Sequence, residues 1–318
     1  MVSVVTLGET MALVRSTEIG SLSNSPPISL GIGGAESNVA IALTRLGVPA
    51  TWIGRVGDDS LGDLVERELR AEGLTVLALR DAGAPTGLMV KERKSSNSTR
   101  VWYYRRGSAG SRLAPDDIDP ALIRAATLLH VTGITLGVSE QARLAVHRAI
   151  SIARDCGVLV SFDLNYRSSL WDEKTAGQEF AHVVPLADIV FGSDNELEMI
   201  AGIGAAPLGE FGELARRVTA MGPRQVAVKL GADGCVVLAG DELVTQPAIS
   251  VTAVDTVGAG DAFVGGYLAD FLLGRSVQQR VTTAVTAGAS ACTVPGDWEG
   301  MPSRSDLEAF SDRDPVCR

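Results

Sequence analysis

Apolar and polar positions change their spacing in a regular order along the chain. Short apolar runs at 2–7, 50–56, 127–132, 158–164 and 189–191 have the length of buried strands. Between them apolar residues recur every three or four positions, and this spacing predicts helices at 60–72, 139–155, 175–184, 195–201, 210–221, 261–273 and 276–291. Strands that alternate with helices predict an α/β fold with a central, mostly parallel sheet and helices on both faces.

Two segments depart from this alternation. Residues 86–92 and 99–105 each alternate in the manner of a strand, and no helix separates them, so we predict an antiparallel hairpin. With strands expected from residues 11–30, this hairpin should form a small sheet apart from the main one. We therefore expect one α/β domain over residues 1–318, with a small β lid from about 11–30 and 85–107. A further strand at 225–229 and a hairpin at 235–239 and 242–246 are expected in the main sheet.

Composition excludes several classes of protein. The 318 residues are 46% hydrophobic with a formal net charge of −10 and no basic patch, which argues against nucleic-acid binding. No apolar run approaches the roughly 20 residues of a membrane span. The chain enters a strand directly, without a charged leader, so we expect a cytoplasmic protein. Its cysteines have no metal-binding spacing and should be free thiols: Cys156, Cys235, Cys292 and Cys317.

Residues 254–263, VDTVGAGDAF, join a glycine-rich turn to an apolar helix. Gly258 and Gly260 permit backbone conformations that a Cβ would forbid. A helix N-terminus reached through such a turn leaves amide N–H groups free and attracts an anion, usually phosphate. Asp261 places a carboxylate at the same point, where it either caps the helix or takes part in chemistry.

Two further segments carry candidate residues. Residues 31–40 form a second glycine-rich entry to a helix, which is either a plain turn with an N-cap or a contact surface for a ligand. Residues 162–167, FDLNYR, follow a buried strand and crowd polar side chains at its carboxyl end, where α/β proteins bind ligands. Asp163 and Arg167 could instead form a structural salt bridge.

The end of the lid hairpin carries a phenol and a guanidinium. Tyr103 and Arg105 are two positions apart on a strand, so they share one face. That face either packs on the sheet or covers a substrate. In the second case Arg105 and Arg167 would converge, and a carboxylate would gain far more from two cations than a neutral sugar would.

The 254–263 segment resembles the C-terminal signature D-T-x-G-A-G-D of the ribokinase-like (PfkB) carbohydrate kinases, and the other motifs follow in the family's order. The resemblance implies a ribokinase-like fold, ATP and Mg²⁺ as cofactors, and Asp261 as catalytic base. It makes Gly258, Ala259 and Gly260, with the Asp261 amide, the anion hole for the transferred phosphoryl group. Gly34 and Asn38 match the motif that contacts sugar hydroxyls.

The same resemblance assigns the remaining motifs. Residues 162–167 match F-D-x-N-x-R, which implies that Asn165 lies near the phosphates and Arg167 near the substrate. Residues 195–198 match N-x-x-E, which implies that Asn195 binds near the phosphates and that Glu198 orients water around Mg²⁺. The loop after 225–229 matches the nucleotide loop, with these implied contacts: Lys229, Gly231 and Gly234.

The run Y-Y-R-x-G-S-A at 103–109 resembles the 2-keto-3-deoxygluconate kinase branch. This implies phosphorylation of 2-keto-3-deoxygluconate (2-dehydro-3-deoxygluconate) to its 6-phosphate, with Tyr103, Arg105 and Arg167 as substrate contacts. Some of these kinases carry another lid tyrosine, and residues 86–98 contain none. A neutral-sugar kinase, such as a fructokinase or ribokinase, stays open, as does a silent sugar-binding regulatory protein. The lid of this family also implies a homo-oligomer.

Overall fold

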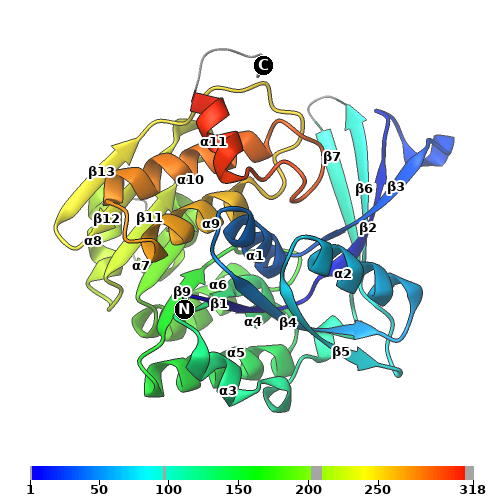
Figure 1. Ribbon diagram of the computed structural model, residues 1–318, viewed down its shortest axis with the longest axis horizontal. Helices are drawn as coiled ribbons and strands as arrows, with labels where there is room; N and C mark the ends of the chain where they lie inside the picture. The colour runs from blue at the N-terminus through cyan, green and yellow to red at the C-terminus, as the bar shows by residue number, and fades with distance from the viewer. Residues whose placement is uncertain (1, 96–97, 202–209, 312–318) are drawn as a thin grey trace.

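The computed structural model describes residues 2–95, 98–201 and 210–311, and a nine-stranded sheet runs through its centre (Figure 1). The strand order is β13-β12-β11-β10-β9-β8-β1-β4-β5. The strands from β5 to β11 in this order are parallel, and β12 and β13 add an antiparallel hairpin. Their bounds are β1 (Val4–Leu7), β4 (Ala50–Gly57), β5 (Thr75–Asp81), β8 (Leu128–Thr132), β9 (Leu159–Asp163), β10 (Ile189–Ser193), β11 (Gln225–Lys229), β12 (Cys235–Ala239) and β13 (Glu242–Gln246).

Helices cover both faces of this sheet, and each face has its own apolar core. One core lies under α1 (Ala35–Arg45), α2 (Ser60–Ala71), α9 (Ala259–Leu272) and α10 (Val277–Ala291), and α11 (Arg304–Ser311) packs on α10. The other core lies under α3 (Pro120–Ala125), α4 (Gly133–Val138), α5 (Glu140–Asp155), α6 (Glu173–Val183), α7 (Asp194–Ala201) and α8 (Phe211–Thr219). The predicted α/β fold with a mostly parallel sheet between two helical layers is confirmed.

A second, four-stranded sheet stands at the side of the main one (Figure 1). It has the order β3-β2-β6-β7 and is built from β2 (Met11–Ser16), β3 (Ile28–Gly33), β6 (Leu88–Ser95) and β7 (Ser98–Tyr104). We call it the lid. Its central pair, β2 and β6, is parallel, and the outer pairs are antiparallel.

The strand β3 shows where sequence reasoning needed correction. Residues 31–33 were expected in a turn before α1, yet they complete a lid strand. The reason is the alternation of Ile28, Leu30 and Ile32 with small residues on the opposite face. A Cβ at Gly33 would lie 2.4 Å from the Asp297 carboxylate, so glycine is needed there for packing and not for turning. The edge strand β5 and the short helices α3, α4 and α11 were not predicted.

The expectations of free cysteines and of no membrane-spanning segment can be compared with the structure. Cys156, Cys235 and Cys292 are free, as expected, and Cys317 lies outside the described residues. Within the described part of the chain, no helix has both the length and the apolar character needed to cross a bilayer.

Replacing Phe180 by alanine tests the core on the α5 side. Phe180 is fully buried and makes edge-to-face contacts with Phe162 and Trp171, so its truncation leaves a cavity. We expect Phe180→Ala to lower the free energy of unfolding by about 3–5 kcal/mol in urea titrations. Leu144→Ala is the control, because Leu144 is 42% exposed on α5. Equal losses in the two variants would contradict this account of the core.

Candidate active site

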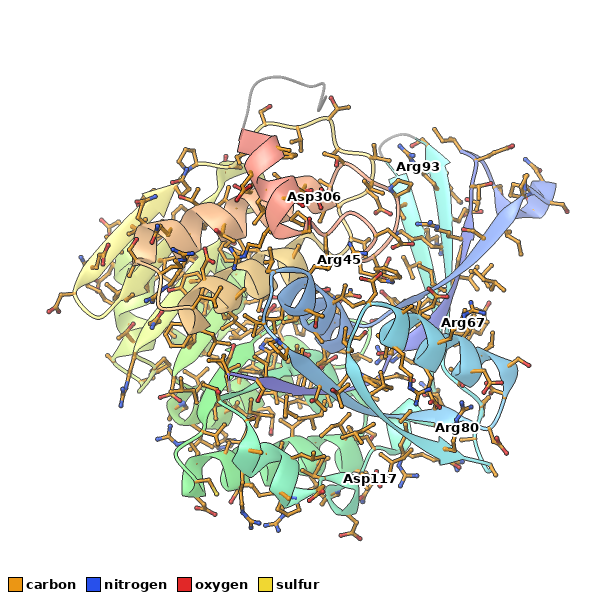
Figure 2. The ribbon with its side chains drawn as sticks, in the orientation of Figure 1. Arg45, Arg67, Arg80, Arg93, Asp117 and Asp306 are labelled. Carbon is orange, nitrogen blue, oxygen red and sulfur yellow. The ribbon has the colours of Figure 1, made fainter. Side chains whose placement is uncertain are left out.

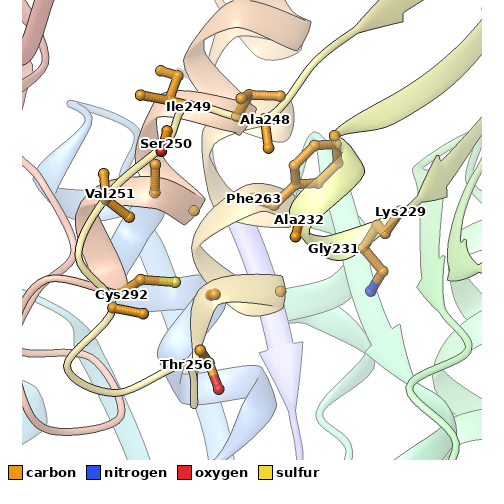
Figure 3. Close-up of a pocket in the computed structure, with 17 residues that line it drawn as sticks. Lys229, Gly231, Ala232, Ala248, Ile249, Ser250, Val251, Thr256, Phe263 and Cys292 are labelled. Atoms are coloured by element: carbon orange, nitrogen blue, oxygen red, sulfur yellow. The ribbon is translucent and has the colours of Figure 1, made fainter.

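Two cavities lie at the carboxyl edge of the main sheet, where β9, β10 and β11 end. The first, which we call the α10 cavity, has a volume of about 510 Å³ and lies among α9, α10 and the loops that follow β11 and β13 (Figure 3). The second, the lid cavity, has a volume of about 610 Å³ and lies between the lid and the sheet. Four residues line both, so the cavities meet there: Lys229, Gly231, Thr256 and Gly260.

The lid cavity gathers residues from many separate segments of the chain. It brings together the positions that the sequence assigned to a substrate site: Gly34, Asn38, Tyr103, Arg105, Arg167 and Asp261. Asn165, Lys229, Gly231, Gly258 and Gly260 lie on the same wall. The cavity also contains Glu9, Met89 and Asp297, which sequence reasoning missed because no motif marks them.

The α10 cavity has a largely apolar wall. Gly231 and Gly234 lie at one side of it, as predicted, with positive φ angles of 57° and 103°. A Cβ at Gly234 would lie 2.0 Å from the Gln246 carbonyl oxygen, which explains the glycine. The opposite wall is formed by Phe263, the last residue of the 254–263 motif, and by apolar residues that belong to no motif and were not predicted: Ala248, Ile249, Val251, Val285 and Cys292 (Figure 3).

The junction of the cavities is the turn that starts α9. Gly258 is the N-cap residue with φ 78°, and no side chain caps the helix. A Cβ at Gly258 would lie 1.8 Å from the carbonyl oxygen of Asp297, so only glycine fits. The first amides of α9 have no side-chain partner and face the meeting point of the cavities. Such a helix N-terminus favours an anion.

Asp261 does not cap this helix, which settles one of the alternatives. It is the third residue of α9, only 8% exposed, and its Oδ2 accepts a hydrogen bond of 2.8 Å from Asn38 Nδ2. Burial raises the pKa of Asp261 to about 7, against the opposing effect of the Asn38 hydrogen bond, and the nearby Asp163 raises it further. A carboxylate with this pKa can accept a proton near neutral pH.

Lys229 and Asp163 form an ion pair at the ends of β11 and β9. Lys229 Nζ lies 2.7 and 2.8 Å from the two carboxylate oxygens of Asp163. Burial is the largest effect on the pKa of Lys229 and acts to lower it, but the combined attraction of Asp163, Glu196 and Asp261 raises this pKa, so the lysine stays charged. The salt bridge considered between Asp163 and Arg167 is therefore replaced by one with Lys229.

The two arginines of the lid cavity differ in their partners. Arg105 is paired with the buried Glu9, with Nε and Nη2 at 2.8 and 2.7 Å from Oε2. Arg167 is exposed, and its Nη1 donates to the Tyr166 carbonyl at 3.1 Å. Among the described residues, no carboxylate lies within 4.0 Å of the Arg167 guanidinium. We expected Arg105 and Arg167 to converge on a ligand. Both line the lid cavity, but Glu9 neutralises Arg105, so of these two arginines only Arg167 has no carboxylate partner among the described residues.

The structure places Glu196, not Glu198, at the site. Glu196 lines the lid cavity, and its two oxygens accept bonds of 2.7 Å from the Tyr166 and Ser193 amides. Asn195 and Glu198 line neither cavity. The pattern Ser193-x-x-Glu196 at the start of a helix is a capping-box signature and was the signal that would have found this residue.

Comparison with known proteins agrees with this geometry. The sequence model of the pfkB family of carbohydrate kinases matches residues 1–304. The chain belongs to this family. It is 35% identical to a 2-dehydro-3-deoxygluconokinase of Bacillus subtilis (strain 168), over 96% of this chain and 94% of the relative. Several fructokinases are also similar, at 30–33% identity.

Solved structures support the same family. The 2-dehydro-3-deoxygluconokinase of Thermotoga maritima has a TM-score of 0.91 and 27% identity, over 97% of this chain and 98% of the other. A putative ribokinase II from E. coli in complex with ATP and Mg²⁺ has a TM-score of 0.87 and 25% identity, over 98% and 99%. The protein is therefore a carbohydrate kinase with a ribokinase-like fold.

The pKa of Asp261 leads to a prediction about pH. A general base must be ionised, so kcat/KM should be constant above about pH 7 and fall about tenfold per pH unit well below it. Asp261→Asn should lower kcat by roughly 10²–10⁴-fold with ATP binding retained. A coupled ADP-release assay measures the rates, and calorimetry measures ATP binding.

Stability provides the control for this variant. Because the folded state raises the pKa of Asp261, the ionised carboxylate disfavours folding above about pH 7, so Asp261→Asn should be at least as stable there. Asp155→Asn, at an exposed position at the end of α5, should leave both rate and pH profile unchanged. A near-normal kcat for Asp261→Asn would remove Asp261 as the base.

Proposed function

We propose that this protein is an ATP-dependent sugar-acid kinase that converts 2-dehydro-3-deoxygluconate to its 6-phosphate. The observation that carries the proposal is the position of Asp261, at the junction of an apolar cavity and a cavity that holds Arg105 and Arg167. The similarity to 2-dehydro-3-deoxygluconokinases supports the choice of substrate. On this proposal residues 1–318 form a single kinase domain with the lid inserted, and the protein works in the cytoplasm.

Phosphoryl transfer at this junction needs a base and an anion hole. The substrate lies in the lid cavity, with Gly34 and Asn38 next to its hydroxyl groups. Asp261 takes the proton of the acceptor hydroxyl. The hydroxyl oxygen of the sugar forms a bond to the γ-phosphorus, while the bond between the γ-phosphorus and the bridging oxygen of ADP breaks. The amides of Gly258, Ala259, Gly260 and Asp261 donate to the oxygens of the transferred group. Loss of one such donor typically costs about 3 kcal/mol.

The α10 cavity suits the nucleotide. Its apolar wall fits a flat base, and Gly231 and Gly234 let the backbone approach the ligand closely. Asn165 and Lys229 lie toward the lid cavity, where the phosphates would extend. Lys229 would then exchange part of its contact with Asp163 for a phosphate oxygen.

Mg²⁺ fits this site through water and phosphate. Among the described residues, no three His, Cys, Asp or Glu side chains are grouped to hold a metal. Mg²⁺ commonly binds through substrate phosphates, waters and one or two carboxylates, and the carboxylate of Glu196 lies on the cavity wall for this role. When bound, the ion neutralises charge on the phosphates. The metal contact expected of Glu198 is thus assigned to Glu196.

Arg167 distinguishes a sugar acid from a neutral sugar. Its guanidinium has no carboxylate partner among the described residues, so a substrate carboxylate would complete a charge-assisted pair. Arg105 is held by Glu9, and the pair can bind hydroxyl groups at no net charge. A neutral sugar such as fructose has no carboxylate to pair with the Arg167 guanidinium, so this cation would add little to its binding.

Substrate preference tests this assignment. Arg167→Gln should lower kcat/KM for 2-dehydro-3-deoxygluconate by roughly 10–100-fold, because a hydrogen bond to a charged group is lost, and should leave any turnover of fructose unchanged. Arg106→Gln, at an exposed position outside both cavities, is the control. Higher wild-type turnover of fructose would favour a neutral-sugar kinase. Absence of ADP release with any sugar would favour a silent binding protein.

The outer face of the lid supports a homo-oligomer. Ile28, Leu30 and Tyr104 are 57%, 60% and 64% exposed. The strand register places them on the same face as Val90 and Trp102, opposite to the face that covers the cavity. Large exposed apolar side chains clustered on one sheet face typically mark an interface, and a second lid is the partner we propose.

Disrupting this face should separate the subunits. Leu30→Glu places a charge in the proposed contact and should shift the protein from dimer or higher oligomer to monomer in light scattering after size exclusion. Leu144→Glu, an exposed leucine on α5 remote from the lid, should not change the mass. A wild-type protein that is monomeric at micromolar concentration would contradict the lid interface.

A further inference from the structure

A lysine of the lid is buried between two aspartates of the core. Lys91 on β6 is 5% exposed, and its Nζ lies 2.5 Å from Asp255 Oδ2 and 3.1 Å from Asp297 Oδ1. The three side chains are 6%, 10% and 7% exposed. Charges so deeply buried are unfavourable unless they are paired in good geometry. Lys91 belongs to none of the motifs in the sequence, so its role must come from what it contacts.

The two aspartates control the turn that begins α9. Asp255 accepts hydrogen bonds of 3.2 Å from the Val257 amide and from the Gly296 amide, so it ties the turn to the loop after α10. The carbonyl of Asp297 lies against Gly258, where a Cβ would be 1.8 Å from it. The position of the Gly258 turn is therefore set by the two residues that Lys91 holds together.

Other lid residues reach the same loop. Arg15 is the Cα partner of Lys91 on β2, and it bonds the Pro295 carbonyl at 2.5 Å and Glu299 at 3.2 Å. Trp298 donates from Nε1 to the Ile32 carbonyl of β3 at 3.2 Å. The loop is thus fastened to three lid strands, but among these contacts only Lys91 also reaches the turn before α9.

The opposite side of the loop is fastened to the core. Arg45 (Figure 2), at the end of α1, donates from Nη1 to the Met301 carbonyl at 2.6 Å and forms an ion pair with Glu72 at 2.7 Å. The loop cannot shift freely when the lid shifts, because it is held from both sides. We expect a change at Lys91 to act on the Gly258 turn through Asp255 and Asp297, while Arg45 still holds the end of the loop.

Charge gives the contact a second effect. The carboxylates of Asp255 and Asp297 belong to residues that contact the turn proposed to receive a phosphoryl group, Asp297 also lines the lid cavity, and Lys91 is the cation that balances one of the two charges. Without it, two buried negative charges would repel each other and the incoming anion. Their repulsion would also separate the two segments that define the turn.

We infer that Lys91 is a positioning residue for phosphoryl transfer: it joins the lid to the anion hole and offsets negative charge behind it. The inference rests on the proposed anion hole at Gly258 to Asp261. It assigns to the lid a part in the chemical step in addition to covering the substrate.

Lys91→Met tests the inference because methionine keeps most of the volume and removes the charge. ADP release is measured with the sugar that the wild-type protein turns over best, so the wild-type rate tests the proposed function separately. We expect kcat to fall by roughly 10–100-fold, the effect of leaving a buried charge unpaired, while KM for the sugar changes less than about threefold. Lys94→Met is the matched control, because Lys94 is also on β6 and its side chain is 49% exposed.

A second substitution separates charge from packing. Lys91→Met/Asp297→Asn restores the balance of one net negative charge, so it should recover about tenfold or more of the lost kcat, which a merely structural role would not. Ethylammonium added to Lys91→Ala should also raise kcat, and tetramethylammonium at equal ionic strength should not.

Three results would overturn the inference. The first is wild-type kcat in Lys91→Met. The second is a folded, impaired Lys91→Met that Asp297→Asn does not improve, together with a folded Lys91→Ala that ethylammonium does not improve. If Lys91→Met does not fold, the double variant Lys91→Met/Asp297→Asn should still fold and turn over substrate. The third result is a double variant that is as unfolded as Lys91→Met.

Discussion

The close contact between Gly258 and the backbone of Asp297 is the constraint on which the site depends. It leaves no room for a side chain, so α9 must begin with a bare turn and uncapped amides. Asp261 follows in the first turn of the same helix, and its distance from the amides is fixed by helix geometry. Both cavities open on this point. On the proposed mechanism, the base and the anion hole are therefore parts of the same helix.

Most charges of the site are paired within the protein. Lys229 holds Asp163, Arg105 holds Glu9, and Lys91 holds Asp255 and Asp297. Because burial of a lone charge is unfavourable, these pairs keep the cations in place without ligand. On the proposed mechanism, a phosphate that approaches Lys229 would compete with Asp163 for the ammonium group. Arg167 is exposed and has no carboxylate partner among the described residues, so an anion could bind it without displacing one.

Sequence reasoning succeeded where local pattern decides the structure. The hairpin at 235–239 and 242–246 and the strand at 225–229 have the predicted bounds, because short apolar runs bounded by polar residues and a turn at Gly240 leave few other arrangements. Gly258 and Asp261 were found for a similar reason, since a glycine-rich entry to a helix is a local feature.

It failed where distant segments decide the structure. Glu9 pairs with Arg105, 96 positions away, and Lys91 pairs with Asp297, 206 positions away, and no local pattern encodes either contact. Glu196 was missed by two positions because acidic residues are repeated at the start of α7, and only the fold shows which one turns inward. The division of the four-stranded lid between two chain segments has one more consequence: the chain crosses between lid and core before β2, after β3, before β6 and after β7. The lid is therefore joined to the core by four separate crossings of the backbone, and any movement of the lid relative to the core must change the conformation of all four.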